Sequence, residues 1–157
     1  MTKYTIMDKV SNENAHNTFA ELLKMGVIPI VNENDTVATD ELGIGDNDTL
    51  GAIVAKTIKA DLLIILSDID CLYTADPHKD KNAVLVNRVE DITDEIVAMT
   101  GGAGTALGTG GMVTKIKAAK IATAGGSDMV IANGSDPLKL YDIIKGESIG
   151  TRFIGKK

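Results

Sequence analysis

The sequence has 157 residues, of which 44% are hydrophobic and 24% charged, and its formal net charge is −6. This length favours one domain with a buried core, and the negative charge gives no electrostatic reason to bind the phosphate backbone of nucleic acid. No apolar run approaches the roughly 20 residues that span a bilayer, so we expect a cytoplasmic protein with neither a nucleic-acid nor a membrane partner.

The first part of the chain predicts two helices and two strands. Apolar residues at helical spacing predict helices over residues 14–25 and 47–59. Short apolar runs at residues 27–31 and 62–66 are expected of buried strands, although Pro29 in the first run cannot donate to a strand ladder. The polar and acidic stretch between the first strand and the second helix is expected to be a loop.

The second part of the chain continues this alternation of helices and strands. It predicts, in order, a strand at 84–89, a helix at 93–99, a glycine-rich loop at 100–111, a helix at 112–124, a strand at 129–132, a helix at 137–145 with proline in its first turn, and a strand at 150–154. This order predicts an α/β fold, a three-layer α/β/α sandwich around a mainly parallel sheet. Ligands of such sheets bind beyond the carboxyl ends of the strands, where three polar segments would gather. They are the loop at Asn32, Ser67-Asp68 and Asn133-Gly134-Ser135-Asp136.

Carboxylates and carboxamides gather at both ends of the loop after the first predicted strand. They stand in Asn32-Glu33-Asn34-Asp35 and in Gly45-Asp46-Asn47-Asp48. Carboxamides donate and accept hydrogen bonds and a carboxylate can hold an ammonium group, so together they suit a zwitterion such as an amino acid. The alternative is a solvated loop in which Asp46 or Asn47 caps the following helix. No turn requires so many acids, so the whole cluster favours a binding site.

A glycine-rich segment, Gly108-Thr109-Gly110-Gly111-Met112-Val113-Thr114-Lys115, leads into a helix start, where backbone N–H groups can hold phosphate. It is neither a Walker A motif nor the dinucleotide fingerprint. Lys115 could lean back toward the loop and meet the charge on a transferring phosphoryl group, or it could be a surface lysine. Asp48 lies in the first turn of its helix, where the helix dipole alone favours a carboxylate. It could also orient a catalytic lysine.

Other candidates for metal chemistry are weaker. Asp68-Ile69-Asp70 and Asp76-Pro77 are ordinary features of strand ends and turns. Neither His16 nor His78 has a matching histidine or cysteine partner, and Cys71 is the only cysteine. We therefore predict no metal bound directly by protein side chains.

Taken in order, the motifs resemble those of the amino-acid kinase family. They are Val31-Asn32-Glu33-Asn34-Asp35, Gly45-Asp46-Asn47-Asp48, Leu66-Ser67-Asp68-Ile69-Asp70, Leu72-Tyr73-Thr74-Ala75-Asp76-Pro77 and Gly108 to Lys115. The first, second and last are similar to the branch of the family that phosphorylates glutamate. The resemblance extends to the closing Gly146-Glu147-Ser148-Ile149-Gly150-Thr151, so it covers nearly the whole chain.

The resemblance implies ATP-dependent phosphorylation of the γ-carboxylate of L-glutamate, with Mg²⁺ carried by the nucleotide. Asp35 and Asn47 would contact glutamate, with Asn32 and Asp46 nearby. Lys115 would stabilise the transferring phosphoryl group, and Asp48 would hold lysines in register. The residues implied to line the ATP site are Ser67, Asp68, Thr109, Gly110, Gly111, Met112, Val113, Thr114 and Lys115.

The resemblance also implies that residues 1–157 form a partial kinase domain. The family's domain begins with a strand, a phosphate-binding lysine and glycine loops that have no counterpart here, and neither does the RNA-binding-like C-terminal domain of some members. We expect an exposed sheet edge that makes the chain a homo-oligomer or pairs it with the N-terminal part. Two alternatives stay open: a family member acting on another carboxylate, phosphate or carbamate, and an incomplete module that binds nucleotide or amino acid without turnover.

Overall fold

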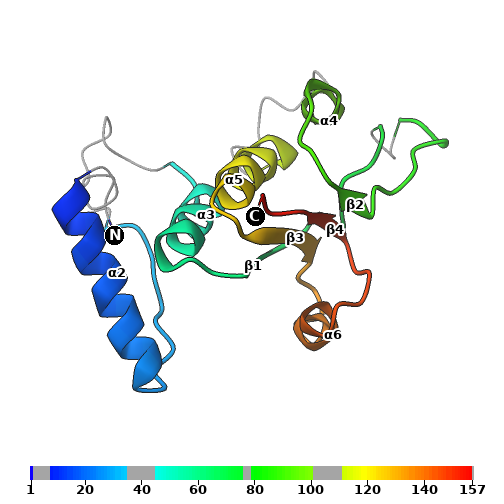
Figure 1. Ribbon diagram of the computed structural model, residues 1–157. Coiled ribbons are helices and arrows are strands. Elements are labelled where there is room, and N and C mark those ends of the chain that lie inside the picture. Colours follow the sequence, from blue (N-terminus) through cyan, green and yellow to red (C-terminus); the bar gives the residue numbers. More distant parts are fainter. Residues whose placement is uncertain (2–7, 35–44, 76–78, 101–110, 157) are drawn as a thin grey trace.

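A computed structural model describes residues 1, 8–34, 45–75, 79–100 and 111–156 of the chain. Its helices are α2 (Lys9–Lys24), α3 (Asn47–Ile58), α4 (Asp94–Met99), α5 (Met112–Ala124) and α6 (Lys139–Lys145). Its strands are β1 (Leu62–Ser67), β2 (Arg88–Val89), β3 (Asp128–Asn133) and β4 (Thr151–Phe153). The α/β class is therefore confirmed (Figure 1).

The strands form one sheet in the order β1-β3-β4-β2. β1 and β3 run parallel, with Leu62 opposite Asp128 and Ser67 opposite Asn133. β4 runs antiparallel to β3, and β2 runs parallel to β4. The sheet is thus mainly parallel, as predicted, and β1 forms one of its edges.

Alternate residues of β3 face two different layers. Met129 and Ile131 are fully buried in the larger apolar cluster, which includes side chains of α3 and α5. Val130 and Ala132 pack on the other face with Ile143 of α6. Figure 1 shows α3 and α5 on one side of the sheet and α6 on the opposite side, which confirms the three-layer arrangement.

Short connections place the starts of two helices at the same edge of the sheet. Only residues 59–61 separate α3 from β1, and only residues 125–127 separate α5 from β3. Each helix therefore runs back along its strand, and its first turn lies near the carboxyl end of that strand. We call this side of the sheet the carboxyl edge, because β1 and β3 both end there at Ser67 and Asn133.

Gly150 and Thr151, before and at the start of β4, hold neighbouring loops against the sheet. Gly150 has a φ of +68°, and an added Cβ would lie 1.9 Å from the carbonyl oxygen of Ile131, so only glycine fits. The buried Thr151 hydroxyl accepts a hydrogen bond from the Leu72 N–H at 2.8 Å and donates one to the Val86 carbonyl at 2.7 Å. These bonds anchor the segments that follow β1 and precede β2.

The strand predicted over residues 27–31 is wrong. The segment has no strand ladder, and Ile28 and Ile30 are 87% and 99% exposed. Pro29 has no N–H to donate to a ladder, and within the described residues the segment does not pair with the free side of β1.

The other predicted helices and strands are present: the helix predicted over 112–124 keeps its bounds as α5, and the others differ at one or both ends. The first helix begins earlier, at Lys9, because the carboxylate of Asp8 caps it by accepting from the Ser11 N–H at 2.8 Å. The strand predicted over 84–89 is reduced to β2, and α6 begins at Lys139, so Pro137 precedes the helix instead of lying in its first turn. Over the described ranges, no helix combines the length and the apolar character needed to cross a membrane.

Candidate active site

A buried ion pair joins the first turns of α3 and α5 at the carboxyl edge. The Lys115 Nζ lies 3.2 Å from Oδ2 of Asp48, and the two side chains are 4% and 18% exposed. Lysine is almost never buried to this degree without a partner, so Asp48 accounts for the placement of the charge. The burial of Lys115 rules out the alternative of a surface lysine. Its predicted approach to the glycine-rich loop stays a prediction, because residues 101–110 of that loop lie outside the described residues.

Small side chains explain why these two helix starts converge. Ala52 of α3 and Ala118, Ala119 and Ala122 of α5 are completely buried in the larger apolar cluster. Alanines on facing surfaces let two helix backbones approach closely, since no long side chain separates them. The close approach brings the first turn of α5 within reach of Asp48.

The start of α3 is fixed by Asp46. One carboxylate oxygen of Asp46 accepts from the Thr49 N–H at 2.7 Å, and the other accepts from the Thr49 hydroxyl at 2.8 Å. Asp46 is therefore the helix N-cap, which is the structural alternative that the sequence offered for it. With the helix start fixed, Asp48 occupies the first turn, where the helix dipole also favours its charge.

Two predicted substrate residues lie on one concavity beside α3. Asn32 and Asn47 both line a cavity of about 440 Å³ between the segment at residues 29–32, α3 and β1. The backbone carbonyl of Asn32 accepts a hydrogen bond from the N-terminal ammonium group of Met1 at 2.6 Å. Most of the remaining lining is apolar, including Leu50, Val54 and Leu62. Asn32 and Asn47 thus supply the polar side chains of a lining that is otherwise apolar.

The end of β1 forms a second polar group at the carboxyl edge. The Ser67 hydroxyl donates to Asp68 Oδ1 at 2.9 Å and accepts from the Ile69 N–H at 3.3 Å. The side-chain amide of Asn133 donates to Asp70 Oδ1 at 2.6 Å, which ties the end of β3 to the loop after β1. The sequence pointed to Asn133 only as part of a polar loop; its place opposite Ser67 in parallel strands could have singled it out.

The remaining predicted site residues divide into two groups. Gly111, Met112 and Val113 start α5, where the N-cap Gly111 provides no capping side chain. Asp35, Thr109 and Gly110 lie outside the described residues.

Cys71, four residues after the end of β1, lacks the features of a reactive thiol. Its side chain is buried, with 1% of the residue exposed. Burial raises the pKa of the Cys71 thiol above its ordinary value, the nearby charge of Asp70 raises it further, and a hydrogen bond with Tyr73 acts in the opposite direction. A protonated, buried thiol is a poor nucleophile. Within the described ranges there is also no cluster of histidine, cysteine and acidic residues that could hold a metal ion.

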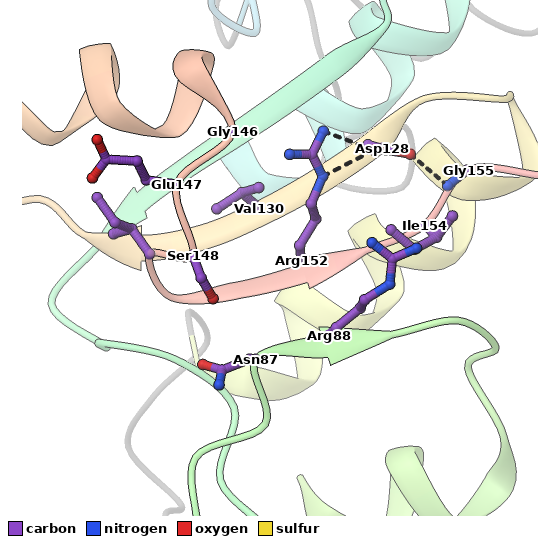
Figure 2. Close-up of a pocket in the computed structure, with 11 residues that line it drawn as sticks. Asn87, Arg88, Asp128, Val130, Gly146, Glu147, Ser148, Arg152, Ile154 and Gly155 are labelled. Carbon is purple, nitrogen blue, oxygen red and sulfur yellow. Dashed lines mark hydrogen bonds and ion pairs between the residues drawn. The ribbon is translucent and has the colours of Figure 1, made fainter.

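A second cavity, shown in Figure 2, lies on the face of the sheet that carries Val130 and α6. Its volume is about 480 Å³, and none of the predicted site residues lines it. Asp128 accepts hydrogen bonds there from Arg152 Nε and from the Gly155 N–H, both at 2.9 Å, so its carboxylate links β3 to β4 and the segment that follows. We interpret this group as structural.

Comparison with known sequences identifies the family of the chain. The Amino acid kinase family profile matches residues 2–133. The chain therefore belongs to the amino acid kinase family, as the order of its motifs predicted.

Curated relatives make the similarity more specific. Glutamate 5-kinase of Clostridium tetani is 56% identical over 153 residues, which are 98% of this chain and 57% of that protein. Glutamate 5-kinase of Clostridium perfringens is 50% identical over 161 aligned positions, covering 100% of this chain and 60% of that protein. The chain thus spans about three fifths of the length of these relatives.

Solved structures support the fold alone. Carbamate kinase from Giardia lamblia, bound to AMP-PNP, superposes with a TM-score of 0.64 at 22% identity, covering 90% of this chain and 49% of that one. UMP kinase from Bacillus anthracis superposes with a TM-score of 0.61 at 16% identity, covering 90% and 52%. The amino-acid kinase fold is thereby confirmed.

Proposed function

We propose that the protein carrying this chain transfers the γ-phosphoryl group of ATP to the γ-carboxylate of L-glutamate. The observation that supports this most is the buried Lys115, held by Asp48 at the edge where a parallel sheet binds its ligands. The relatives named glutamate 5-kinase support the choice of acceptor. The product would be glutamyl 5-phosphate, the first intermediate toward proline, made in the cytoplasm.

Phosphoryl transfer to a carboxylate requires mainly positioning and positive charge from the protein. A carboxylate oxygen of glutamate attacks the γ-phosphorus, the bond from that phosphorus to the β,γ-bridging oxygen breaks, and ADP leaves. The acceptor is already deprotonated at neutral pH, so no general base is needed. Negative charge shifts toward the bridging oxygen, where Lys115 and the first backbone N–H groups of α5 would stabilise it, together with Mg²⁺ carried by the nucleotide.

The proposed glutamate site uses the acid and amide cluster. Asp35 would hold the substrate ammonium group and Asn47 would contact the substrate, with Asn32 and Asp46 nearby. The position of Asn32 and Asn47 on one cavity supports this assignment. Because Asp46 already caps α3 with both carboxylate oxygens, its part would be to hold Asn47 and Asp48 in place. Ser67, Asp68 and the segment from Thr109 to Lys115 would line the ATP site.

ADP release by the intact protein tests the acceptor. The protein is given MgATP and, in separate reactions, L-glutamate, L-aspartate, N-acetyl-L-glutamate, carbamate and UMP. We expect L-glutamate alone to stimulate ADP release strongly, because the proposed site recognises both a free ammonium group and a side-chain carboxylate of one length. Stronger stimulation by any other acceptor would overturn the assignment and favour a different member of the family.

A second candidate is that residues 1–157 alone bind nucleotide or amino acid without turnover and need a partner. The exposed Ile28 and Ile30 and the open edge of β1 support it, because apolar surface beside an unpaired strand favours association. The partner would be a second copy or the rest of the kinase domain. Calorimetry with a non-hydrolysable ATP analogue and glutamate, followed by turnover of the same sample, separates binding from catalysis.

A further inference from the structure

The hydroxyl of Thr114 occupies a position that the sequence motif alone did not indicate. Its Oγ1 lies 2.8 Å from Oδ2 of Asp48 and 2.8 Å from the carbonyl oxygen of Gly111. The residue is partly buried between the start of α5 and the start of α3. A hydroxyl has one proton to donate, so it donates to one of these two acceptors at a time, and its oxygen lies within hydrogen-bond distance of Asp48 on α3.

Thr114 and Lys115 reach the same atom of Asp48. The Lys115 Nζ lies 3.2 Å from Oδ2, the oxygen that also faces the Thr114 hydroxyl. A hydrogen bond to a carboxylate is roughly twice as strong as one between neutral groups, and two donors fix the carboxylate more firmly than one. The short threonine side chain has a single heavy-atom torsion, whereas lysine has four, so Thr114 is the donor that sets the geometry.

We propose that Thr114 is a positioning residue: its hydroxyl holds the Asp48 carboxylate, and through it the Lys115 ammonium group, and it does not bind the nucleotide. The inference builds on the proposed phosphoryl transfer, for which a misplacement of about 1 Å can lower the rate by about 100-fold. It reassigns Thr114 from the ATP site to the support of Lys115. The Gly111 contact joins Thr114 to the N-cap of its own helix.

A first test measures how accessible Lys115 is, and it needs no turnover. The 157-residue chain and its Thr114→Val and Thr114→Ser variants are treated with a trace of acetic anhydride, and acetylation of each lysine is measured by mass spectrometry. Lys24, whose side chain is 70% exposed, is the internal standard. We expect Thr114→Val to raise the relative acetylation of Lys115 by about threefold or more, because its partner carboxylate loses one of two restraints. Thr114→Ser should match the parent chain.

A matched control comes from the other end of the same helix. The buried Thr123 of α5 donates its hydroxyl to the Ala119 carbonyl at 2.8 Å, far along the helix from Asp48. Thr123→Val removes a helical threonine hydroxyl in the same way, so it should leave Lys115 acetylation unchanged. Circular dichroism shows whether each variant is folded at the labelling temperature, and Thr114→Ala replaces Thr114→Val if the latter is not.

A second test uses the intact protein and separates positioning from nucleotide binding. We expect Thr114→Val to lower kcat about tenfold and to leave the KM for ATP within about twofold, with Thr114→Ser close to the parent. A raised KM for ATP with unchanged kcat and unchanged Lys115 acetylation would overturn the proposal and return Thr114 to the ATP site. If the parent protein shows no glutamate-dependent turnover, the proposed function fails, and the acetylation result alone still decides the role of Thr114.

Discussion

β3 and β1 have the same kind of continuous apolar sequence, but the structure buries them differently. The four central residues of β3, Met129 to Ala132, are at most 2% exposed. β1 has only one buried residue, Ile65, and Leu66 is 38% exposed. β3 has a strand on each side and helices on both faces, whereas β1 pairs only with β3 in the described structure. These two apolar runs therefore both form strands, but the neighbours of each strand decide how much of it is buried.

The same contrast separates the candidate site from the open edge. Asp48, Thr114 and Lys115 lie at the carboxyl edge, at the starts of α3 and α5, which pack against each other on one face of the sheet. Beside β1, the segment at residues 27–31 leaves Val27, Ile28 and Ile30 exposed. We infer that the packing of α3 on α5 holds charged groups in fixed positions. The exposed surface beside β1 is the one suited to a partner.

The largest expected effect is on turnover, through the buried pair of Asp48 and Lys115. Lys115→Met keeps the length of the side chain but removes its charge, so kcat of the intact protein should fall about 100-fold to 1,000-fold. Lys117→Met, which removes an exposed charge two residues further along α5, is the matched control and should stay within about twofold of the parent. Steady-state ADP release measures both. Equal losses in the two variants would mean that the buried pair has no special part in the chemistry.

A stability measurement tests the difference in packing between β3 and β1. Ile131→Ala should lower the free energy of unfolding by about 2–5 kcal/mol, because it leaves a cavity at a site with 0% exposure. Leu66→Ala should cost less than about 1.5 kcal/mol, since solvent already reaches that side chain. Urea unfolding of the 157-residue chain gives both values. Similar losses would show that β1 is as fully packed as β3.

A smaller effect is expected at the start of α3. Asp46→Ala removes the acceptor for both the N–H and the hydroxyl of Thr49, so it should cost about 1 kcal/mol of stability. Asp46→Asn keeps a side-chain oxygen and should recover most of the loss. Thermal unfolding followed by circular dichroism checks this pair. A stable Asp46→Ala variant would remove the cap as the reason for an acid at this position.

The smallest change in stability is expected at the open edge, where association should change instead. Ile30 is 99% exposed, so Ile30→Lys should shift the free energy of unfolding by no more than about 0.5 kcal/mol. Sedimentation velocity should show association of the parent chain that Ile30→Lys weakens. Val10→Lys, at a position that is 66% exposed on α2, is the control and should leave association unchanged. A monodisperse monomer in the parent chain would contradict the interpretation of this surface.

Most of the fold could be predicted from the sequence because local patterns determine it. The spacing of apolar residues located α3 and α5, and the apolar run at β3 located the centre of the sheet. The failure at residues 27–31 has a physical cause: a β-branched run forms a strand only where it pairs with a neighbour, and this segment, with Pro29 at its centre, does not pair with the free side of β1 in the described structure. Whether the segment pairs with a strand depends on the tertiary arrangement, which cannot be read from the composition of the segment.

The candidate site was predictable in part for a similar reason. Motifs identified Asp48 and Lys115 as candidates, but only the packing of α3 on α5 shows that they meet. The same packing turns the Thr114 hydroxyl toward Asp48, a direction that no sequence spacing fixes. For Asp46, the capping alternative and the binding alternative both fitted the sequence, and the Thr49 contacts favour the cap.

The most direct measurement traps the proposed product. Hydroxylamine converts an acyl phosphate into a hydroxamate, which gives a coloured complex with ferric iron. The intact protein with MgATP and L-glutamate should form the hydroxamate at a rate that Lys115→Met lowers at least about 100-fold, while calorimetry shows that the variant still binds glutamate. Formation of the hydroxamate at the same rate in the parent and in Lys115→Met would contradict the claim that this buried lysine carries the phosphoryl transfer.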